Sequence, residues 1–495
     1  MVLLIFYANK KTGGATKAFP LLHRRFSMDH QSNANPIMSF LANYKTISKS
    51  YNKNIDLNYF KKRGIIGVYC ISMEKEETVL NLSIKNVGKI KLAEIAFDGI
   101  TVICGNNNTG KSTVGKILFS IFNTLCNADE KIEQVQKREI KQIITKYGLP
   151  LEENFSLRNS FVSDFFSYFK ELGNTGILYH DVLRFLKKYP DLPHKNELAA
   201  EIADKMRIPK EQLLNEYIFR YFNSIFNEQI RNLIVDNRAS SKVELRLKGK
   251  ENSIQFYQKK CVLSQKMPII HPAYYIDNPF VLNHLNAGYP IQFVPGNDLD
   301  KNVIRTILDS KRTQSDDKMS DIFDSVGNKE KLEEVYSVLR KAYSGTTAIK
   351  DNQYVYHEGT TDIYLQNIST GLKSFALIER LLESGKLKQQ DVLILDEPEI
   401  HLHPEWQLIY AEMIVVLQKT FDLTILVTTH SPYFLEALEV YTKKHKLEEK
   451  ANYYLAINEA ENCVMKNVTN NLEEIYQLMF NPMQKLEDME NEQFE

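Results

Sequence analysis

A glycine-rich stretch that ends in lysine and serine has residue types and spacing that suit phosphate binding. Gly105-Asn-Asn-Asn-Thr-Gly-Lys-Ser112 fits the pattern G-x-x-x-x-G-K-[ST] at every position. Its two glycines let the backbone turn tightly, and a helix that starts there directs its positive dipole end at the anion. Lys111 is expected to reach the β- and γ-phosphates, and Ser112 to bind Mg²⁺. The predicted nucleotide-binding residues of this loop are Gly105, Asn106, Asn107, Asn108, Thr109, Gly110, Lys111, Ser112 and Thr113.

Two acidic residues follow a second apolar run, Val392-Leu-Ile-Leu395. Such a run predicts a strand buried on both faces, and open α/β sheets bind ligands at the carboxyl ends of their strands. Asp396 is therefore expected to hold Mg²⁺ through water. Glu397 is expected to polarise the water that attacks a γ-phosphate. An acid pair alone is also common in a solvated turn, but its combination with the phosphate loop favours a catalytic site.

Two shorter motifs extend the set. Ser369-Thr-Gly371 precedes a predicted helix over 375–382, and Ser369 suits a helix N-cap that can bind an anion. Thr424-Ile-Leu-Val-Thr-Thr predicts a strand that ends at His430, a position suited to sensing the γ-phosphate. In isolation the serine would be an ordinary cap and the histidine a structural residue. Their order after the phosphate loop favours roles at a nucleotide.

The order of these four motifs resembles the ABC ATPases. Asp396-Glu-Pro-Glu-Ile-His-Leu-His-Pro404 and Thr428-Thr-His-Ser-Pro432 are similar to the SMC/RecF/OLD-like branch of the AAA family. The resemblance covers residues 79–123 and 350–435. It implies an α/β fold, an ABC-type P-loop ATPase head with a parallel core sheet and an antiparallel β lobe. It also implies a homodimer, or a higher homo-oligomer, that binds ATP and Mg²⁺ between subunits and hydrolyses the ATP.

The resemblance also assigns roles to single residues. Three residues of one subunit would be catalytic: Lys111, Glu397 and His430. Two would hold the metal: Ser112 and Asp396. Two residues of the other subunit would close on the γ-phosphate: Ser369 and Gly371. The loop 400–404 would communicate between the two sites. The glutamine that the family places near the metal stays open among Gln134, Gln136 and Gln265.

The elements around the motifs predict one ATPase domain over 73–480 with a mostly helical insertion at 125–267 and an acidic tail at 481–495. Alternation at 79–85 and 90–97 predicts an antiparallel strand pair, and 100–104 a buried strand. Aromatic residues and leucines at three- and four-residue spacing predict helices over 125–235. Residues 243–257 resemble a hairpin, and 268–276 a return to the main sheet.

Residues 1–72 differ in composition from the rest, with eleven Lys and Arg against two acidic residues. Three interpretations remain open: a basic arm for nucleic acid, a poorly ordered extension, or a start-site artefact, since Met73 precedes the patterned region.

Composition narrows the class of protein. The chain has 495 residues, 43% hydrophobic and 25% charged, with a net charge of +0, as in ordinary globular proteins without a strong overall field for DNA or membranes. Five scattered cysteines form no CxxC pair, and no apolar run approaches the roughly 18 residues of a membrane helix. A cytoplasmic protein with reduced thiols and no membrane partner is expected.

Features that the sequence lacks indicate which members of the SMC/RecF/OLD-like branch it resembles. OLD-type nucleases carry a Toprim domain, whereas the short stretch after His430 shows no convincing acidic metal cluster. The spacing between Lys111 and Ser369 is too short for the long arms of chromosome-organising SMC proteins. The chain thus resembles the compact ATPases of Septu-type anti-phage systems, which imply a separate effector such as an HNH nuclease. The alternative is a RecF-like DNA-repair ATPase with DNA as its partner; a transporter subunit is disfavoured by the long insertion.

Overall fold

The computed structural model separates the chain into two units, Met1–Glu77 and Thr78–Glu495. The residues that it describes are 4–5, 68–69, 80–147, 155–171, 178–190, 192–232, 240–247, 249–286, 296–313 and 332–492. In the first unit, β1 (Leu4–Ile5) pairs antiparallel with β2 (Val68–Tyr69). The three interpretations of residues 1–72 otherwise concern residues outside this described part.

An eleven-stranded mixed sheet forms the centre of the second unit, in the order β8-β7-β6-β3-β4-β16-β15-β5-β14-β13-β9. Its parallel strands are β15 (Ala451–Glu459), β5 (Ile100–Gly105), β14 (Thr424–Thr429), β13 (Val392–Asp396) and β9 (Ala273–Ile276). Its antiparallel part contains β3 (Leu80–Val87), β4 (Ile90–Phe97), β6 (Ser241–Leu247), β7 (Lys250–Phe256) and β8 (Cys261–Leu263), and β16 (Asn462–Asn467) joins the two parts. This arrangement confirms the predicted α/β class with a parallel core and an antiparallel lobe.

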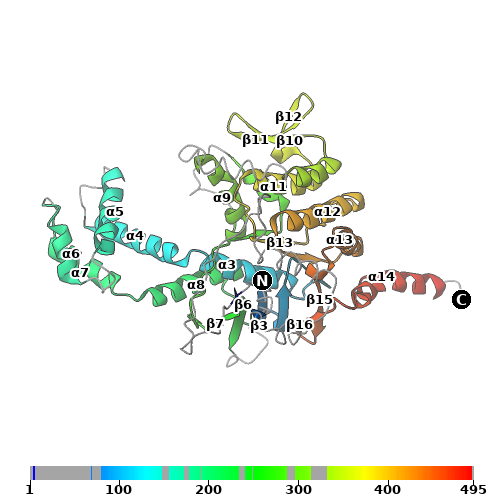
Figure 1. Cartoon of the computed structure of the whole chain (residues 1–495), viewed down its shortest axis with the longest axis horizontal. Helices are drawn as coiled ribbons and strands as arrows, with labels where there is room; N and C mark the ends of the chain where they lie inside the picture. Colours follow the sequence, from blue (N-terminus) through cyan, green and yellow to red (C-terminus); the bar gives the residue numbers. More distant parts are fainter. Residues whose placement is uncertain are drawn as a thin grey trace, which may run out of the picture. The chain divides into compact units, whose positions relative to one another are not determined.

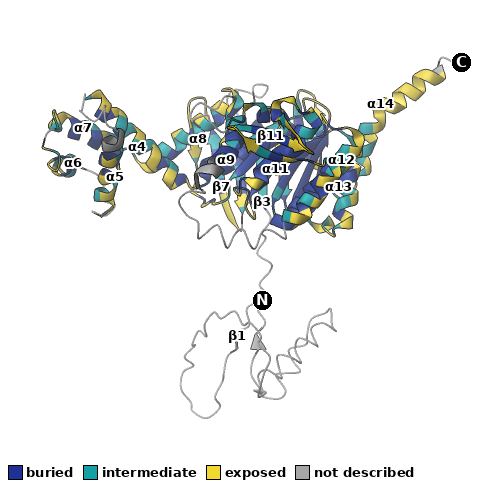
Figure 2. Cartoon of the chain, turned by 90° about the horizontal axis from the view of Figure 1, so that it is seen from above, coloured by how far each residue is buried: buried dark blue, intermediate teal, exposed yellow. Residues whose placement is uncertain are grey.

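The central strands are buried on both faces because helices cover each side of the sheet. Along β5, Val102 packs into one hydrophobic core, while its neighbour Ile103 packs into the other. Helices α11 (Thr370–Glu383), α12 (Pro404–Phe421) and α13 (Pro432–Lys444) contribute to the first core; α3 (Lys111–Leu125) and α8 (Lys210–Phe226) contribute to the second. Figure 2 shows the buried residues concentrated in this sheet and its covering helices.

The predicted insertion contains a helical lobe with a hydrophobic core of its own. Residues of α4 (Ala128–Lys146), α5 (Phe155–Glu171), α6 (Tyr179–Leu186) and α7 (Lys195–Met206) share that core (Figure 1). The predicted hairpin after the helices is β6–β7, and the predicted return to the main sheet is β9.

Several elements were not foreseen in the sequence. A separate three-stranded antiparallel sheet contains β10 (Thr346–Lys350), β11 (Gln353–Glu358) and β12 (Thr361–Tyr364), and α9 (Asp298–Thr313) precedes it. The helix predicted over 375–382 begins earlier, at Thr370, because Ser369 caps it. The acidic tail is helical as far as the structure describes it, within α14 (Glu473–Glu492). Among the described residues, no helix is both long enough and apolar enough to cross a membrane.

Candidate active site

The phosphate loop lies between β5 and α3, as the motif predicts. Gly105 and Gly110 both have positive φ, 150° and 81°, and both lack room for a side chain. A Cβ on Gly105 would lie 2.7 Å from the Ala456 carbonyl oxygen of the neighbouring strand, and one on Gly110 would lie 3.0 Å from Ile90 Cγ1. Glycine is therefore required at both ends of the loop, where the backbone turns into the helix.

Lys111 is 4% exposed and points into the curve of the loop. Its Nζ donates to the carbonyl oxygens of Gly105 at 2.9 Å and Asn106 at 3.0 Å, and it lies 3.4 Å from Glu397 Oε1. The loop borders a cavity of about 310 Å³ that is lined by Lys89, Asn107, Asn108, Thr109, Gly110, Lys111, Ser112, Thr113 and Glu397. A cavity lined by a glycine-rich loop, two lysines and a helix N-terminus suits a polyphosphate.

Asp396 accepts hydrogen bonds from three hydroxyl groups at the carboxyl end of β13. Ser112 Oγ donates to Oδ1 at 3.1 Å, Thr428 Oγ1 also donates to Oδ1, and the Tyr275 hydroxyl donates to Oδ2 at 2.6 Å. Burial and the nearby Asp396 charge hold the pKa of Tyr275 well above its ordinary value, so the phenol stays a donor. The serine hydroxyl beside a carboxylate is the kind of hard oxygen pair that fits Mg²⁺.

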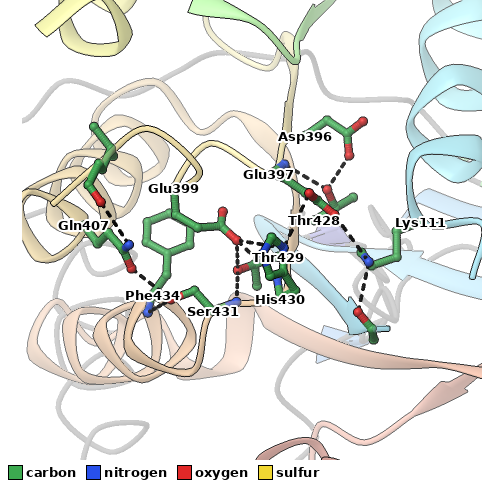
Figure 3. Close-up of polar contacts among 12 residues, drawn as sticks. Lys111, Asp396, Glu397, Glu399, Gln407, Thr428, Thr429, His430, Ser431 and Phe434 are labelled. Carbon is green, nitrogen blue, oxygen red and sulfur yellow. Dashed lines mark hydrogen bonds and ion pairs between the residues drawn. The ribbon is translucent and has the colours of Figure 1, made fainter. Parts of the chain in front are cut away.

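Glu397 lies between the two other predicted catalytic residues (Figure 3). Its Oε1 is 3.4 Å from Lys111 Nζ, and its Oε2 is 3.4 Å from His430 Nδ1. The backbone of Glu397 has φ 50°, an unusual conformation for a residue with a side chain. Its N–H donates to Thr428 O at 3.1 Å and Thr428 Oγ1 at 3.0 Å, and these bonds hold the turn that directs the carboxylate toward the phosphate loop.

Ser369 and Gly371, the residues predicted to close on the γ-phosphate of a second subunit, lie at the start of α11. Ser369 Oγ accepts a hydrogen bond from Leu372 N at 3.3 Å and so caps the helix, as predicted. Gly371 packs closely against the loop that follows β13: a Cβ there would lie 3.0 Å from the His401 carbonyl oxygen and from the Trp406 ring. Neither residue lines the cavity at the phosphate loop of the same chain.

The sequence analysis assigned no role to three polar residues near Asp396: Tyr275, Thr428 and Asp277. Asp277 directly follows β9, which runs parallel to β13, so it lies at the same sheet edge as Asp396. Desolvation and the nearby Asp300 and Asp396 raise its pKa to about 6. The signal available was the acid at the end of an apolar strand. The three glutamine candidates are absent from the cavity lining; Gln134 and Gln136 lie on α4, and Gln265 donates to the Glu251 carbonyl.

Comparison with known proteins bears on this site directly. A family described as "AAA ATPase domain" matches residues 79–435, a range that holds the phosphate loop, the acidic strand and His430. The chain belongs to this AAA ATPase family. The chain is also 33% identical over 92 residues to the Septu protein PtuA of Bacillus thuringiensis; the match covers 16% of this chain and 22% of that protein.

Among solved structures, similarity extends to the head domains of SMC proteins. An SMC head bound to the C-winged helix domain of ScpA has 11% identity and a TM-score of 0.43, and it covers 80% of this AAA ATPase chain and 99% of its own. The SMC head domain from Thermotoga maritima has 12% identity and a TM-score of 0.34, with 79% and 98% covered. An SMC head domain with an extended coiled coil, derived from Pyrococcus furiosus, has 12% identity and a TM-score of 0.37, with 83% and 99% covered.

Proposed function

We propose that this AAA ATPase binds ATP with Mg²⁺ at the phosphate loop and hydrolyses it to ADP and phosphate. The observation that carries the proposal is the position of Glu397, 3.4 Å from both Lys111 Nζ and His430 Nδ1 and directly after Asp396. A carboxylate at that position can accept a proton from a water that attacks the γ-phosphate. The direct test is phosphate release from ATP by the purified chain, which must require Mg²⁺ and stop with excess EDTA.

The other site residues bind the phosphates, the metal ion and the γ-phosphate in the proposed reaction. Lys111 and the loop N–H groups bind the phosphates and neutralise the charge that builds on them. Ser112 and Asp396 would hold Mg²⁺, which would supply positive charge beside the phosphates. His430, half-exposed beside Glu397, is placed to donate a hydrogen bond to the γ-phosphate. Phosphate transfer is thereby promoted mainly by positioning and charge.

The complete site is formed by two copies of the chain. Ser369 caps α11, and the free N–H groups of such a helix N-terminus bind anions. Because Ser369 and Gly371 lie outside the cavity of their own chain, the proposal places them on the γ-phosphate of a second copy. ATP then holds the dimer together. Sedimentation of the Glu397→Gln variant tests this: dimerisation must depend on ATP, and an unchanged monomer with saturating ATP contradicts it.

The cellular role that we propose is to gate a separate effector, such as an HNH nuclease, in anti-phage defence. Its support is the partial similarity to PtuA, which spans about a fifth of that protein. The test is the mass of the complex purified as Glu397→Gln with ATP and Mg²⁺ from cells that carry the neighbouring genes. A second protein of defined stoichiometry supports gating. A bare dimer contradicts it and leads to the DNA-repair alternative.

The DNA alternative receives less support from the described residues. In the insertion, basic residues that such binding could use include Lys242 and Arg246, and both are paired with acids on the β6–β7 hairpin. Lys242 Nζ lies 2.6 Å from Glu244 Oε1, and Arg246 Nη2 lies 3.3 Å from Glu251 Oε2. Such pairs lower the positive charge available to phosphates. Binding of this chain to DNA at low salt, with a steep loss as salt rises, would reverse that preference.

A further inference from the structure

Glu399 is a buried acid that the proposed reaction does not use directly. Its side chain is 3% exposed, two residues beyond Glu397. One oxygen, Oε1, accepts hydrogen bonds from Thr429 Oγ1 at 2.5 Å and from the backbone N–H of His430 at 3.1 Å (Figure 3). The other oxygen, Oε2, has no hydrogen-bond partner among the described residues. Burial raises the pKa of this carboxyl, and the two donors to Oε1 act in the opposite direction. Folding alone gives little reason to bury such a group here.

The groups bound to Glu399 are His430 itself and the residue before it. Thr429 Oγ1 also accepts from Ser431 N at 3.1 Å, so the two-residue turn between β14 and α13 is joined to the same carboxylate. Ser431 in turn caps α13 and donates to Gln407 at 2.8 Å. The ring of His430 extends from this turn, with Nδ1 3.4 Å from Glu397 Oε2 and 3.7 Å from Glu399 Oε1.

Glu399 also directly precedes the loop 400–404. Its carbonyl oxygen accepts from Leu402 N at 2.9 Å, and the carbonyl oxygen of the adjacent His401 lies against Gly371. Glu399 therefore connects the loop after the acidic strand with the turn that carries His430. Gln407 forms a second bridge between them, because it accepts from Ser431 Oγ and donates to the Leu402 carbonyl oxygen at 3.2 Å.

We infer that Glu399 is a positioning residue that holds His430 beside Glu397 through its hydrogen bonds to Thr429 and the His430 backbone. The inference rests on the proposed ATPase function. Without these bonds the turn is still held at Ser431 by Gln407 but no longer at Thr429 and His430 by Glu399, so His430 moves away from Glu397. Such a displacement lowers kcat with little change in ATP binding, because the phosphate loop lies on other elements.

Two substitutions distinguish the effect of the position of the Glu399 oxygen from the effect of its charge. Glu399→Gln keeps an oxygen at the same distance and removes the charge; Glu399→Asp keeps the charge and withdraws the carboxylate by one methylene. We expect Glu399→Asp to lower kcat about 10- to 100-fold with KM for ATP within about threefold. We expect Glu399→Gln to retain kcat within about threefold, because Oε1 still accepts both hydrogen bonds.

A double-mutant cycle distinguishes positioning from a general effect on folding. In a His430→Ala background, Glu399→Asp should change kcat by less than about twofold, because the residue it positions is gone. Turnover is normalised to nucleotide-binding sites, and Glu412→Gln, another buried glutamate that pairs with Lys341 and Lys444, is the control and should retain wild-type kcat.

Three results would overturn the inference: an equal loss of kcat in both backgrounds, Glu399→Asp with wild-type turnover, or Glu399→Gln as slow as Glu399→Asp. A wild-type chain that hydrolyses no ATP would instead refute the proposed function, so the two failures are distinguishable.

Discussion

Replacing Glu397 with glutamine removes one charge from the centre of the proposed site and almost nothing from its shape. The carboxylate lies 3.4 Å from Lys111 Nζ, a distance at which two unit charges attract by about 5 kcal/mol at an effective dielectric of 20 and by about 1 kcal/mol in water. In the ATP complex the same carboxylate faces phosphate charge, so its removal also relieves a repulsion. The variant should therefore bind ATP at least as tightly as the wild type.

Turnover should respond in the opposite direction. An amide cannot accept the proton of the attacking water, and loss of a general base typically lowers the rate by about 10²–10⁴, which corresponds to about 3–5 kcal/mol in the barrier. The side chain is 22% exposed, so an amide remains hydrated and the fold should be unaffected.

Single-turnover phosphate release measures the chemical step, and fluorescent-nucleotide titration measures ATP binding separately. Glu412→Gln, a glutamate on α12, is the matched control and should retain both. Hydrolysis by Glu397→Gln within about threefold of wild type would refute the assignment of Glu397 as the base. ATP binding weakened about tenfold or more would instead show that the carboxylate supports the nucleotide itself.

Three further substitutions test other parts of the site. Lys111→Ala should abolish detectable ATP binding in calorimetry, since it removes the buried cation of the phosphate loop, and unaltered affinity would contradict that role. Thr428→Val breaks the hydrogen bonds to Asp396 and Glu397 and should lower both kcat and the free energy of unfolding, the latter by about 1–3 kcal/mol; Thr442→Val, at a buried threonine of α13, should leave kcat unchanged. Asp277→Asn should stabilise the nucleotide-free protein at about pH 7.5 but not at about pH 4, because a carboxyl whose pKa is raised to about 6 in the folded state lowers stability as pH rises between the unfolded and folded values. Thermal melts at both pH values check this, and equal shifts at the two would count against it.

The phosphate loop and the acidic strand could be located from the sequence because each depends on local chemistry. Glycine is needed at positions 105 and 110, where the backbone approaches Ala456 and Ile90, and these required glycines form a motif that can be recognised in the sequence. The run Val392–Asp396 is buried at every position and appears as an unbroken apolar stretch.

Partners of these residues were harder to foresee. Tyr275 and Thr428 contact Asp396 from strands that are adjacent only in the folded sheet. Tyr275 belongs to no local pattern that indicates a site, and the motif that contains Thr428 pointed to His430 rather than to the threonine. The sheet β10–β12 was missed because its strands are short and show little alternation: β10 and β12 are mostly exposed, whereas β11 has three consecutive buried residues. The position of Gly371 against Trp406 likewise depends on how α11 packs on the loop after β13.

The sequence by itself determined which groups can bind phosphate, hold a metal and accept a proton, since backbone turns and strand burial constrain residue types one segment at a time. The tertiary structure decided which of those groups meet. Strand β5 is far from β13 and β14 in the chain, and the parallel register of the three strands places Lys111, Glu397 and His430 at one edge of the sheet. It also joined Glu399 to the turn that carries His430, because hydrogen bonds across a sheet depend on strand order, which no local pattern records.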